Sequence, residues 1–324
     1  DVARLAGTSI STVSRFLNNP EKVNADTAKS IQQAINQLGY FRQGNAGTKA
    51  SRQIGRVGVL TPFFPAPSFV QRLQGMTPVV RQANCELVIY TVETPDQLNE
   101  YLQSLPFMRR LDGLIIMSMI VGENDSRRLI QSGLQVVMIE HGNPLFSRVV
   151  CDNRRGGEIA ARHFLSRAYE NCAFIGDHTT LPYSLHPSDE RFEGFRSTLE
   201  SAGFPLQPDC IRYCEGSVED ARLQARELLE LPIPPRAIFA ASDLMATGVL
   251  KAARARGLRV PQDLAVLGFD DIEMADYLDL STVSQSLNES GRLAAELLLA
   301  RIKDPHRPLQ SVNLDVKVVI RGSA

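Results

Sequence analysis

A short stretch near the N-terminus, GTSISTVSRFLNN at residues 7–19, combines small hydroxyl side chains with a single arginine. Short hydroxyl groups let a backbone approach phosphates, and a guanidinium can donate two hydrogen bonds to a guanine edge. The stretch therefore indicates contact with DNA, although a small helix bundle with serine and threonine on its solvated face would look similar. The side chains that would face the DNA are Ile10, Ser11, Thr12, Ser14 and Arg15.

Three helical segments are predicted to position these side chains. Residues 1–6 form the first, and Gly7 ends it at a position that favours a left-handed backbone. Ser9 can cap the second helix, whose apolar face consists of Val13, Phe16 and Leu17. The third runs from Asn24 to Gly39, and its side chains at helical spacing are Ala28, Ile31, Ile35 and Leu38. Two helices joined by a glycine turn and supported by a third predict a helix-turn-helix.

The charge of the chain is unevenly distributed, although its net value is only −1. Residues 1–56 contain eight Lys and Arg against three Asp and Glu, whereas the remainder contains 27 basic and 33 acidic residues. A basic head on an acidic body indicates that the head alone has a polyanionic partner.

The composition narrows the class of protein. A chain of 324 residues with 44% hydrophobic and 22% charged residues is expected to fold into two or three globular domains. It has no apolar run long enough to span a membrane and no stretch typical of a secretory signal. The five cysteines form no CxxC pair, so we expect mostly buried free thiols in a reducing cytoplasm.

From Ile54 onward, short apolar segments alternate with helical ones. Buried strands are expected at 56–61, 86–92, 113–118, 136–140, 172–176, 237–241 and 264–271. Helices are expected between most of them, for example at 69–84, 96–105, 154–167, 190–203, 218–231 and 243–257. This alternation predicts an α/β fold with two doubly wound parallel-sheet lobes, and ligands at the carboxyl ends of the strands.

The start of the chain, DVARLAGTSISTVSRFLNN, resembles the DNA-binding start of the lactose-repressor (LacI/GalR) family, DVA-x-x-AGVS-x-x-TVSR-x-LN, with Thr8 in place of a valine. The resemblance implies that Ile10 and Ser11 tune base choice and that Arg15 also reads bases. It further implies that Asn18 and Thr27 contact backbone phosphates. Later segments resemble the family's core: DGLI (112–115), VVCDN (149–153), RFEGF (191–195), SDLMATGVL (242–250), GLRVPQDLAVLGFDD (257–271) and STVSQS (281–286).

The resemblance also implies a domain organisation. A helix-turn-helix domain would occupy residues 1–42, a hinge 43–55, and an effector-binding core of the type I periplasmic-binding-protein kind 56–324. The chain would cross between the lobes near residues 168, 286 and 311. The N-lobe would then comprise 56–168 and 287–311, and the C-lobe 169–286 and 312–324. A homodimer that reads a pseudo-palindromic operator is expected.

The linker departs from the family pattern. Family members have a short helix here that forms on DNA and inserts a leucine into the minor groove. In this sequence Gly44 and Gly47 interrupt the segment, and Lys49 stands at the leucine position. Each glycine lowers helix propensity by about 1 kcal/mol. We therefore expect weaker coupling between core and head than in the family, or a DNA bend made in a different way. The alternative is a flexible linker whose Lys49, Arg52 and Arg56 contact phosphates.

Candidate effector contacts follow from the resemblance at the strand ends. Arg191 and Asp270 match an arginine and an acidic residue that bind effector. Ser242 stands where an asparagine commonly contacts the ligand, and Gln285, in the crossover strand, is a further candidate. The alternatives are an ion pair of Arg191 with Asp189 or Glu193, and a helix cap by Asp270 over residues 271–274.

The first loop of the cleft is unusual. The family's P-D-x-x-N-P-F-F becomes PFFPAPSF at residues 62–69. The effector-contact candidates in this loop are Phe63, Ser68 and Phe69. Gly216 and Ser217 replace an aromatic residue, so Phe63, Phe64 or Tyr183 could supply a flat apolar surface, unless they belong to the core.

We therefore expect a DNA-binding transcriptional regulator, a repressor, whose operator affinity responds to a small polar effector such as a sugar. A transporter's solute-binding protein shares the two-lobed core, but it would carry a signal peptide and no basic helical head. An enzyme is not expected, because the sequence has no G-x-S-x-G motif, Walker loop or convincing pair of catalytic carboxylates. The histidines lack metal-ligand spacing, and no metal or cofactor is expected.

Overall fold

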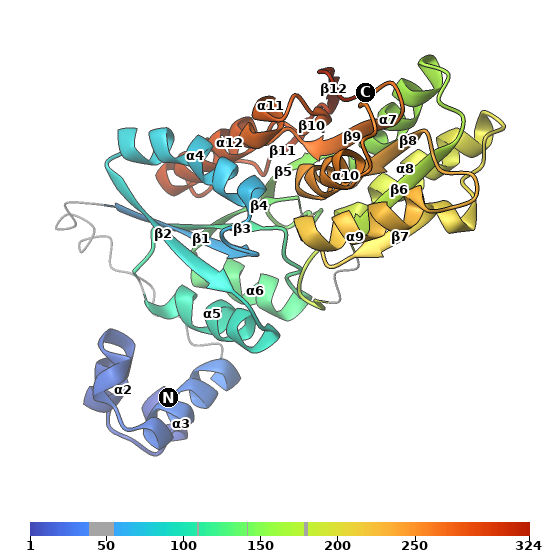
Figure 1. The fold of residues 1–324 in the computed structure, drawn as a ribbon. Helices are drawn as coiled ribbons and strands as arrows, with labels where there is room; N and C mark the ends of the chain where they lie inside the picture. The colour runs from blue at the N-terminus through green and yellow to red at the C-terminus, as the bar shows by residue number, and fades with distance from the viewer. Residues whose placement is uncertain (39–54, 109, 141, 178–180) are drawn as a thin grey trace.

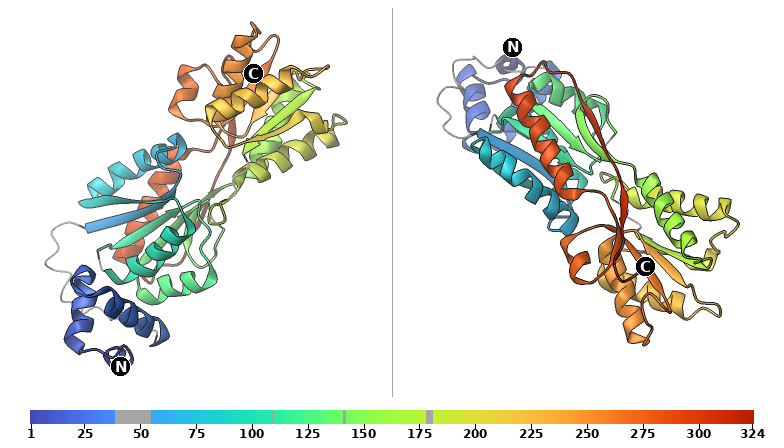
Figure 2. Two further views of the ribbon diagram at one scale, coloured as in Figure 1. Left: turned by 60° about the horizontal axis from the view of Figure 1, so that its bottom comes forward. Right: turned by 90° about the horizontal axis from the view of Figure 1, so that it is seen from above.

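The computed structural model describes residues 1–38, 55–108, 110–140, 142–177 and 181–324. It consists of a small helical head and an elongated body of two lobes, each built on one six-stranded sheet (Figures 1 and 2). Apart from Gly55, the expected hinge at 43–55 lies outside the described residues.

The head contains the three expected helices: α1 (Val2–Leu5), α2 (Ile10–Asn18) and α3 (Ala25–Leu38), with a 3-10 turn, η1 (Pro20–Lys22), between the last two. Gly7 ends α1 with a φ of 62°, the left-handed conformation that the sequence predicted. The Ser9 hydroxyl accepts a 3.1 Å hydrogen bond from the Thr12 amide and caps α2. The three helices enclose an apolar cluster of Val2, Val13, Ile31, Ala34 and Ile35.

Two of the four side chains expected at helical spacing on α3, Ala28 and Leu38, lie outside this apolar cluster. Leu38 lies at the end of α3 and is 45% exposed, because the cluster between the helices is filled by side chains further back along α3. Phe107, on helix α5 (Pro95–Met108) of the body, packs against the same cluster, so the head lies against this helix (Figure 1).

The first sheet has the strand order β11-β5-β4-β3-β1-β2, and its strand pairs are parallel. Its strands are β1 (Gly55–Pro62), β2 (Cys85–Val92), β3 (Gly113–Met117), β4 (Gln135–Ile139), β5 (Ser147–Cys151) and β11 (Ser311–Leu314). Helices α4 (Pro67–Gln82) and α12 (Leu287–Lys303) share one apolar cluster with the sheet. Helices α5 and α6 (Glu123–Ser132) share another cluster with it. Helices thus cover both faces.

The second sheet has the order β12-β10-β9-β8-β6-β7. Its strands are β6 (Cys172–Asp177), β7 (Ile211–Cys214), β8 (Ala237–Ala240), β9 (Ala265–Asp270), β10 (Ser281–Ser284) and β12 (Lys317–Val319). Its helices are α7 (Asn153–Ser166), α8 (Pro187–Ser201), α9 (Val218–Leu229), α10 (Asp243–Ala255) and the short α11 (Glu273–Tyr277), and a 3-10 turn, η3 (Pro208–Cys210), precedes β7. All strand pairs are parallel except β10 with β12, which the sequence did not predict.

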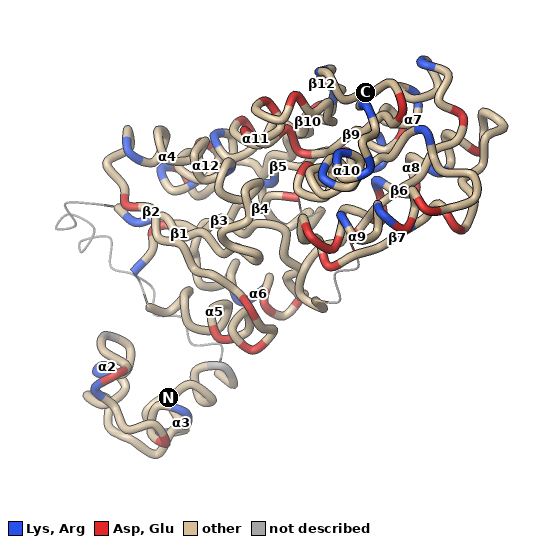
Figure 3. The backbone as a smooth tube through the Cα atoms, in the orientation of Figure 1, with Lys and Arg blue, Asp and Glu red and all other residues tan. Residues whose placement is uncertain are grey.

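Two expected lobe boundaries are wrong. Helix α7 packs in the second lobe, because Ala160, Ala161 and Phe164 belong to its apolar cluster, so the chain first crosses at Asp152 and not near 168. Strand β11 pairs with β5, so the first lobe extends to Leu314 and not to 311. The remaining crossing lies between β10 and α12, at Gln285 and Ser286. Strands β3 and β4 contain no Lys, Arg, Asp or Glu, whereas charged positions occur along the surrounding helices and loops (Figure 3).

One segment of the second lobe reaches onto the first. The Ile120 amide donates to the Tyr183 carbonyl over 2.8 Å, and the Leu185 amide donates to the Ser118 carbonyl over 3.0 Å. Met119 and Ser184 form an antiparallel bridge between these hydrogen bonds. Tyr183 is 5% exposed and belongs to the apolar cluster of the first lobe. We call residues 181–185 the clasp, because they connect the end of β3 to helix α8.

None of the described helices has both the length and the apolar character needed to cross a membrane. All five cysteines are free thiols, as expected. Cys172 and Cys210 are buried, whereas the other three are only partly buried, so the expectation of mostly buried thiols is wrong for those three.

Candidate functional sites

The start of α2 presents the side chains that we expected to face DNA. Ile10 is 81% exposed, and Ser11, Ser14 and Arg15 are also exposed, while Thr12 is half-buried. The Ser9 hydroxyl lies 2.7 Å from that of Ser11 and 2.8 Å from that of Thr12. These contacts hold the first turn of the helix in one conformation.

Thr27 and Asn18 are the two residues that we expected to contact backbone phosphates. Thr27 is half-buried in the first turn of α3, and the side chain of Asn18 lies outside the described part of the structure. The exposed, capped N-terminus of α2 is also where helical N–H groups favour phosphate oxygens. The head thus has the geometry of a helix-turn-helix that presents its second helix to a groove.

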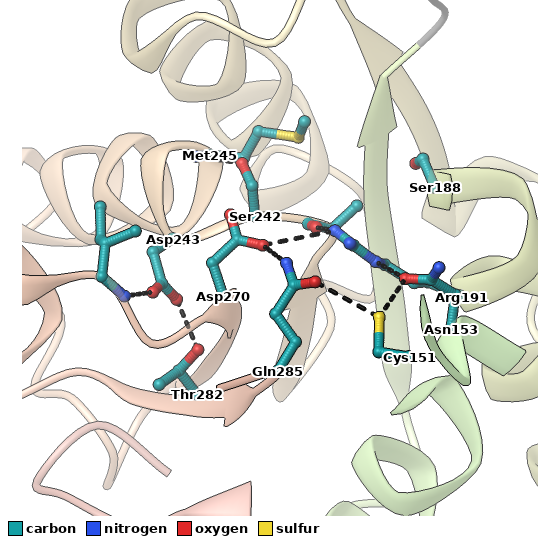
Figure 4. A network of polar contacts seen from close by, with 12 residues as sticks. Cys151, Asn153, Ser188, Arg191, Ser242, Asp243, Met245, Asp270, Thr282 and Gln285 are labelled. Carbon is teal, nitrogen blue, oxygen red and sulfur yellow. Dashed lines mark hydrogen bonds and ion pairs between the residues drawn. The ribbon is translucent and has the colours of Figure 1, made fainter. Parts of the chain in front are cut away.

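Arg191, on α8, is 5% exposed and contacts other groups of the second lobe at its strand ends (Figure 4). Its Nε donates to Asn153 Oδ1 over 2.9 Å, and its Nη1 donates to the Ala241 carbonyl over 2.6 Å. Nη1 lies 3.7 Å from Asp270 Oδ1, and the guanidinium carbon is 3.6 Å from the centroid of the Phe269 ring. The alternative pairing with Glu193 is not formed, because Glu193 binds Arg196.

Asp270 ends β9 and is 8% exposed. Its Oδ1 accepts a 2.6 Å hydrogen bond from Gln285 Nε2. Burial raises the pKa of Asp270 from 3.8 to about 6, although Arg191 and Arg72 lower it. Asp270 does not cap the following helix, because α11 begins after Ile272 without a side-chain cap. Its φ of 119° is rare for a residue with a side chain, a strain that is typical of functional sites.

Asp243 lies close to the same end of β9 and forms hydrogen bonds with the neighbouring segments. Its carboxylate accepts from the Thr282 hydroxyl over 2.5 Å and from the Ile272 amide over 2.9 Å (Figure 4). Burial raises the pKa of Asp243 well above its ordinary value, and the charge of Asp270 adds to this. The carboxylate therefore joins β10 to the segment that follows β9.

Arg72 and Glu140, which the sequence analysis missed, are the charged residues that the first lobe contributes to the site. Arg72, on α4, is 2% exposed; its Nη2 pairs with the Glu140 carboxylate, and its Nε donates to Ser290 Oγ over 3.3 Å. The Ser118 hydroxyl also donates to Glu140. Burial acts to raise the pKa of Glu140, but Arg72 and Ser118 lower it below its ordinary value. The sequence does contain a pattern that could have identified Arg72: it is an arginine on the otherwise apolar buried face of α4, between Phe69 and Met76.

Gln285 connects the two lobes. Its Oε1 accepts from Arg72 Nη2 over 3.1 Å, while its Nε2 donates to Asp270. The Cys151 thiol also lies 3.3 Å from Oε1, and burial raises the pKa of this thiol to about 12, so it stays neutral. The resulting network runs through Ser118, Glu140, Arg72, Gln285, Asp270, Arg191 and Asn153.

Close helix packing holds both arginines in place. A Cβ atom on Gly157 of α7 would lie 1.9 Å from the Arg191 carbonyl oxygen. A Cβ atom on Gly291 of α12 would lie 1.9 Å from the Arg72 carbonyl oxygen. Because only glycine permits this approach, each arginine is fixed by a neighbouring helix.

The remaining candidates lie around this network. Ser242 is half-buried, and its hydroxyl accepts from the Met245 amide over 3.2 Å as the cap of α10. Phe69 is 8% exposed and belongs to the first lobe's core, with the Arg72 guanidinium 5.6 Å above its ring. Ser68 is half-buried in the first turn of α4. Phe63 is 39% exposed, and its ring centroid is 6.0 Å from that of Phe69.

Two α/β lobes meet through a buried network of charged and polar side chains at their strand ends, and a helix-turn-helix head precedes them in the chain. This combination defines a ligand-responsive DNA-binding regulator. Residues 1–43 match the family described as bacterial regulatory proteins, lacI family, and residues 161–324 match the periplasmic binding protein-like domain.

Relatives that match most or all of the chain belong to the same class of protein. The ribose operon repressor of Escherichia coli is 31% identical over 100% of this chain and 98% of its own length. A structure described as the transcriptional regulator CelR–cellobiose complex matches with a TM-score of 0.73 and 26% identity over 100% and 98% of the two chains. A LacI-family regulator from Enterococcus faecium with bound ribose matches with a TM-score of 0.72 and 25% identity over 83% and 98%. The chain belongs to the lacI family and is a DNA-binding transcriptional regulator.

Proposed function

We propose that this regulator is a homodimeric repressor whose affinity for a pseudo-palindromic operator is set by a sugar bound between its lobes. The Gln285 bridge is the observation that carries the proposal, because it connects charged groups of both lobes at their strand ends. A ligand that replaces this bridge would contact both lobes at once.

The charge of the cleft favours a neutral, hydroxyl-rich effector. Arg72 and Arg191 are balanced by Glu140 and Asp270, each carboxylate beside one guanidinium. Adding a charged ligand would leave one buried charge without compensation, which is costly. Sugar hydroxyls both donate and accept, so they can bind arginine, carboxylate and amide groups together. The relatives that bind ribose and cellobiose support the same class of ligand.

The proposed mechanism is a linkage between two binding events. Effector binding would shift the arrangement of the lobes, and with it the spacing of the two heads in the dimer. The change in operator affinity can be no larger than the preference of the effector for one lobe arrangement. On the head, Ile10, Ser11 and Arg15 would read bases, while phosphate contacts would supply affinity that falls with salt.

A thermal-shift screen of the full chain against ribose, glucose, cellobiose and other sugars tests the effector site. A ligand present at about 100 times its Kd should stabilise the protein by about 2.7 kcal/mol. The Arg191→Ala and Asp270→Asn variants should lose this response, and the exposed Lys251→Ala variant should keep it. Recovering the sugar unchanged after prolonged incubation would separate binding from catalysis.

Operator selection from a random duplex library tests the head. We expect an enriched pseudo-palindrome, whose affinity changes when the sugar found in the screen is added. No enrichment at low ionic strength would contradict the proposal.

A further inference from the structure

A cavity of about 230 Å³ lies between the loop after β1, the end of β2 and the clasp. Phe63 and Phe64 line it from the loop, Thr91 and Glu93 from the strand end, and Leu181 and Tyr183 from the clasp. No lining residue belongs to the network of Arg72 and Arg191, so this cavity is separate from that site. It includes Phe63, which we had expected to contact the effector in the cleft.

The apolar walls of this cavity face solvent to an unusual extent. Phe63 and Phe64 are 39% and 41% exposed, whereas phenylalanine side chains are commonly buried. Tyr183 is held on the other side by burial in the first lobe and by its hydroxyl, which donates to the Val92 carbonyl over 3.5 Å. Tyr183 therefore forms a fixed wall opposite the two exposed phenylalanine rings.

Glu93 adds a negative charge to these walls. Its carboxylate is exposed and forms no ion pair within the part of the chain that the structure describes. It lies close enough to Tyr183 for its charge to add to the effect of burial, which raises the pKa of the phenol. Aromatic faces beside a carboxylate are the surroundings that organic cations prefer.

We propose that this cavity is a second ligand site, which takes a small organic cation such as an alkylammonium or arylammonium ion. Phe63 and Phe64 contact its apolar part, and Glu93 pairs with the ammonium group. The volume lies below the ~300–1,000 Å³ of sites for drug-sized ligands, so the ligand is small.

Occupation of this site also acts on the lobes. The ligand touches the first lobe through Phe64 and Glu93, and the clasp of the second lobe through Leu181 and Tyr183. The clasp leads directly into α8, which carries Arg191. Binding in the cavity therefore favours the clasped arrangement and changes affinity in the cleft, a consequence that rests on the proposed function.

Calorimetric titration of the full chain with choline and with phenethylammonium tests the site, using 3,3-dimethylbutanol and 2-phenylethanol as neutral counterparts of the same shape. We expect each cation to bind about tenfold more tightly than its neutral counterpart. Glu93→Gln should abolish this difference, and Phe64→Ala should weaken both cations. Glu100→Gln removes the same charge from an exposed position of α5 outside the cavity and should change nothing.

Equal binding of cations and neutral counterparts, or no binding at millimolar concentration, would overturn the proposal. So would cation binding that survives in the Glu93→Gln variant. Asp270→Asn, which disables the cleft, should leave cation binding intact. If sugars fail to bind while cations bind, the proposed sugar response fails and the second site stands.

Discussion

Gln285 donates from Nε2 to Asp270 Oδ1 over 2.6 Å, and the same amide accepts from Arg72 of the other lobe. A side-chain amide has both a donor group and an acceptor oxygen, so it can bind a carboxylate and a guanidinium at once. This residue lies where the chain crosses between the lobes. Its side chain thereby connects the charged groups that the crossing brings together.

Gln285→Glu should destabilise the protein at pH 7, because a second carboxylate would replace the donor to Asp270. Loss of a hydrogen bond to a charged group predicts a fall of about 1.5–3 kcal/mol in the free energy of unfolding. The loss should shrink at pH 5, where the two carboxyl groups can share a proton. Urea denaturation at both pH values measures this. Gln74→Glu, at an exposed position of α4, is the control, and an equal loss there would contradict the prediction.

Asp270 should make the protein less stable as the pH rises from 4 to 7. Its pKa is about 6 in the folded protein and 3.8 as its ordinary value, so the folded state binds more protons within this window. The free energy of unfolding should fall by about 2 kcal/mol from this group across the window. Asp270→Asn removes the titration, so the wild type should lose stability relative to the variant as pH rises. If the free energies of unfolding of the two proteins differ by the same amount at every pH, the raised pKa of Asp270 is refuted.

Gly157→Ala should weaken effector binding although residue 157 lies outside the cleft network. Its Cβ would meet the Arg191 carbonyl oxygen at 1.9 Å and push α8 away. Overpacking of this kind costs about 1–3 kcal/mol of stability. Gly142→Ala places the same methyl group where, apart from its chain neighbours, no atom of the described residues lies within 4 Å, and should change neither property. Chemical denaturation and effector titration of both variants provide the comparison.

Arg15→Ala should flatten the sequence preference of the head by about 1–3 kcal/mol at one position of each half-site. Lys29→Ala, an exposed change on α3 with the same loss of charge, should weaken binding to every duplex alike. Competition between operator variants measures both effects. An unchanged preference in the Arg15 variant would remove this residue from the set of base readers.

Local patterns predicted much of this structure from the sequence. Gly7 and Ser9 define the ends of the head helices through their own backbone and side-chain preferences, which depend on few distant residues. The resemblance to the lacI family also singled out Arg191, Asp270 and Gln285, and the structure brings these three together.

The sequence did not predict which distant elements meet. The apolar face of α7 would suit either lobe, and only its packing on the second sheet places the first crossing at Asp152. Arg72 and Gln285 are 213 positions apart, and Ser118 meets Leu185 through backbone atoms that carry no sequence signal. Side-chain type and spacing therefore determined the helices, the strands and part of the cleft. The tertiary structure decided the Arg72–Glu140 pair and the clasp, because a contact between remote segments depends on the path of the whole chain.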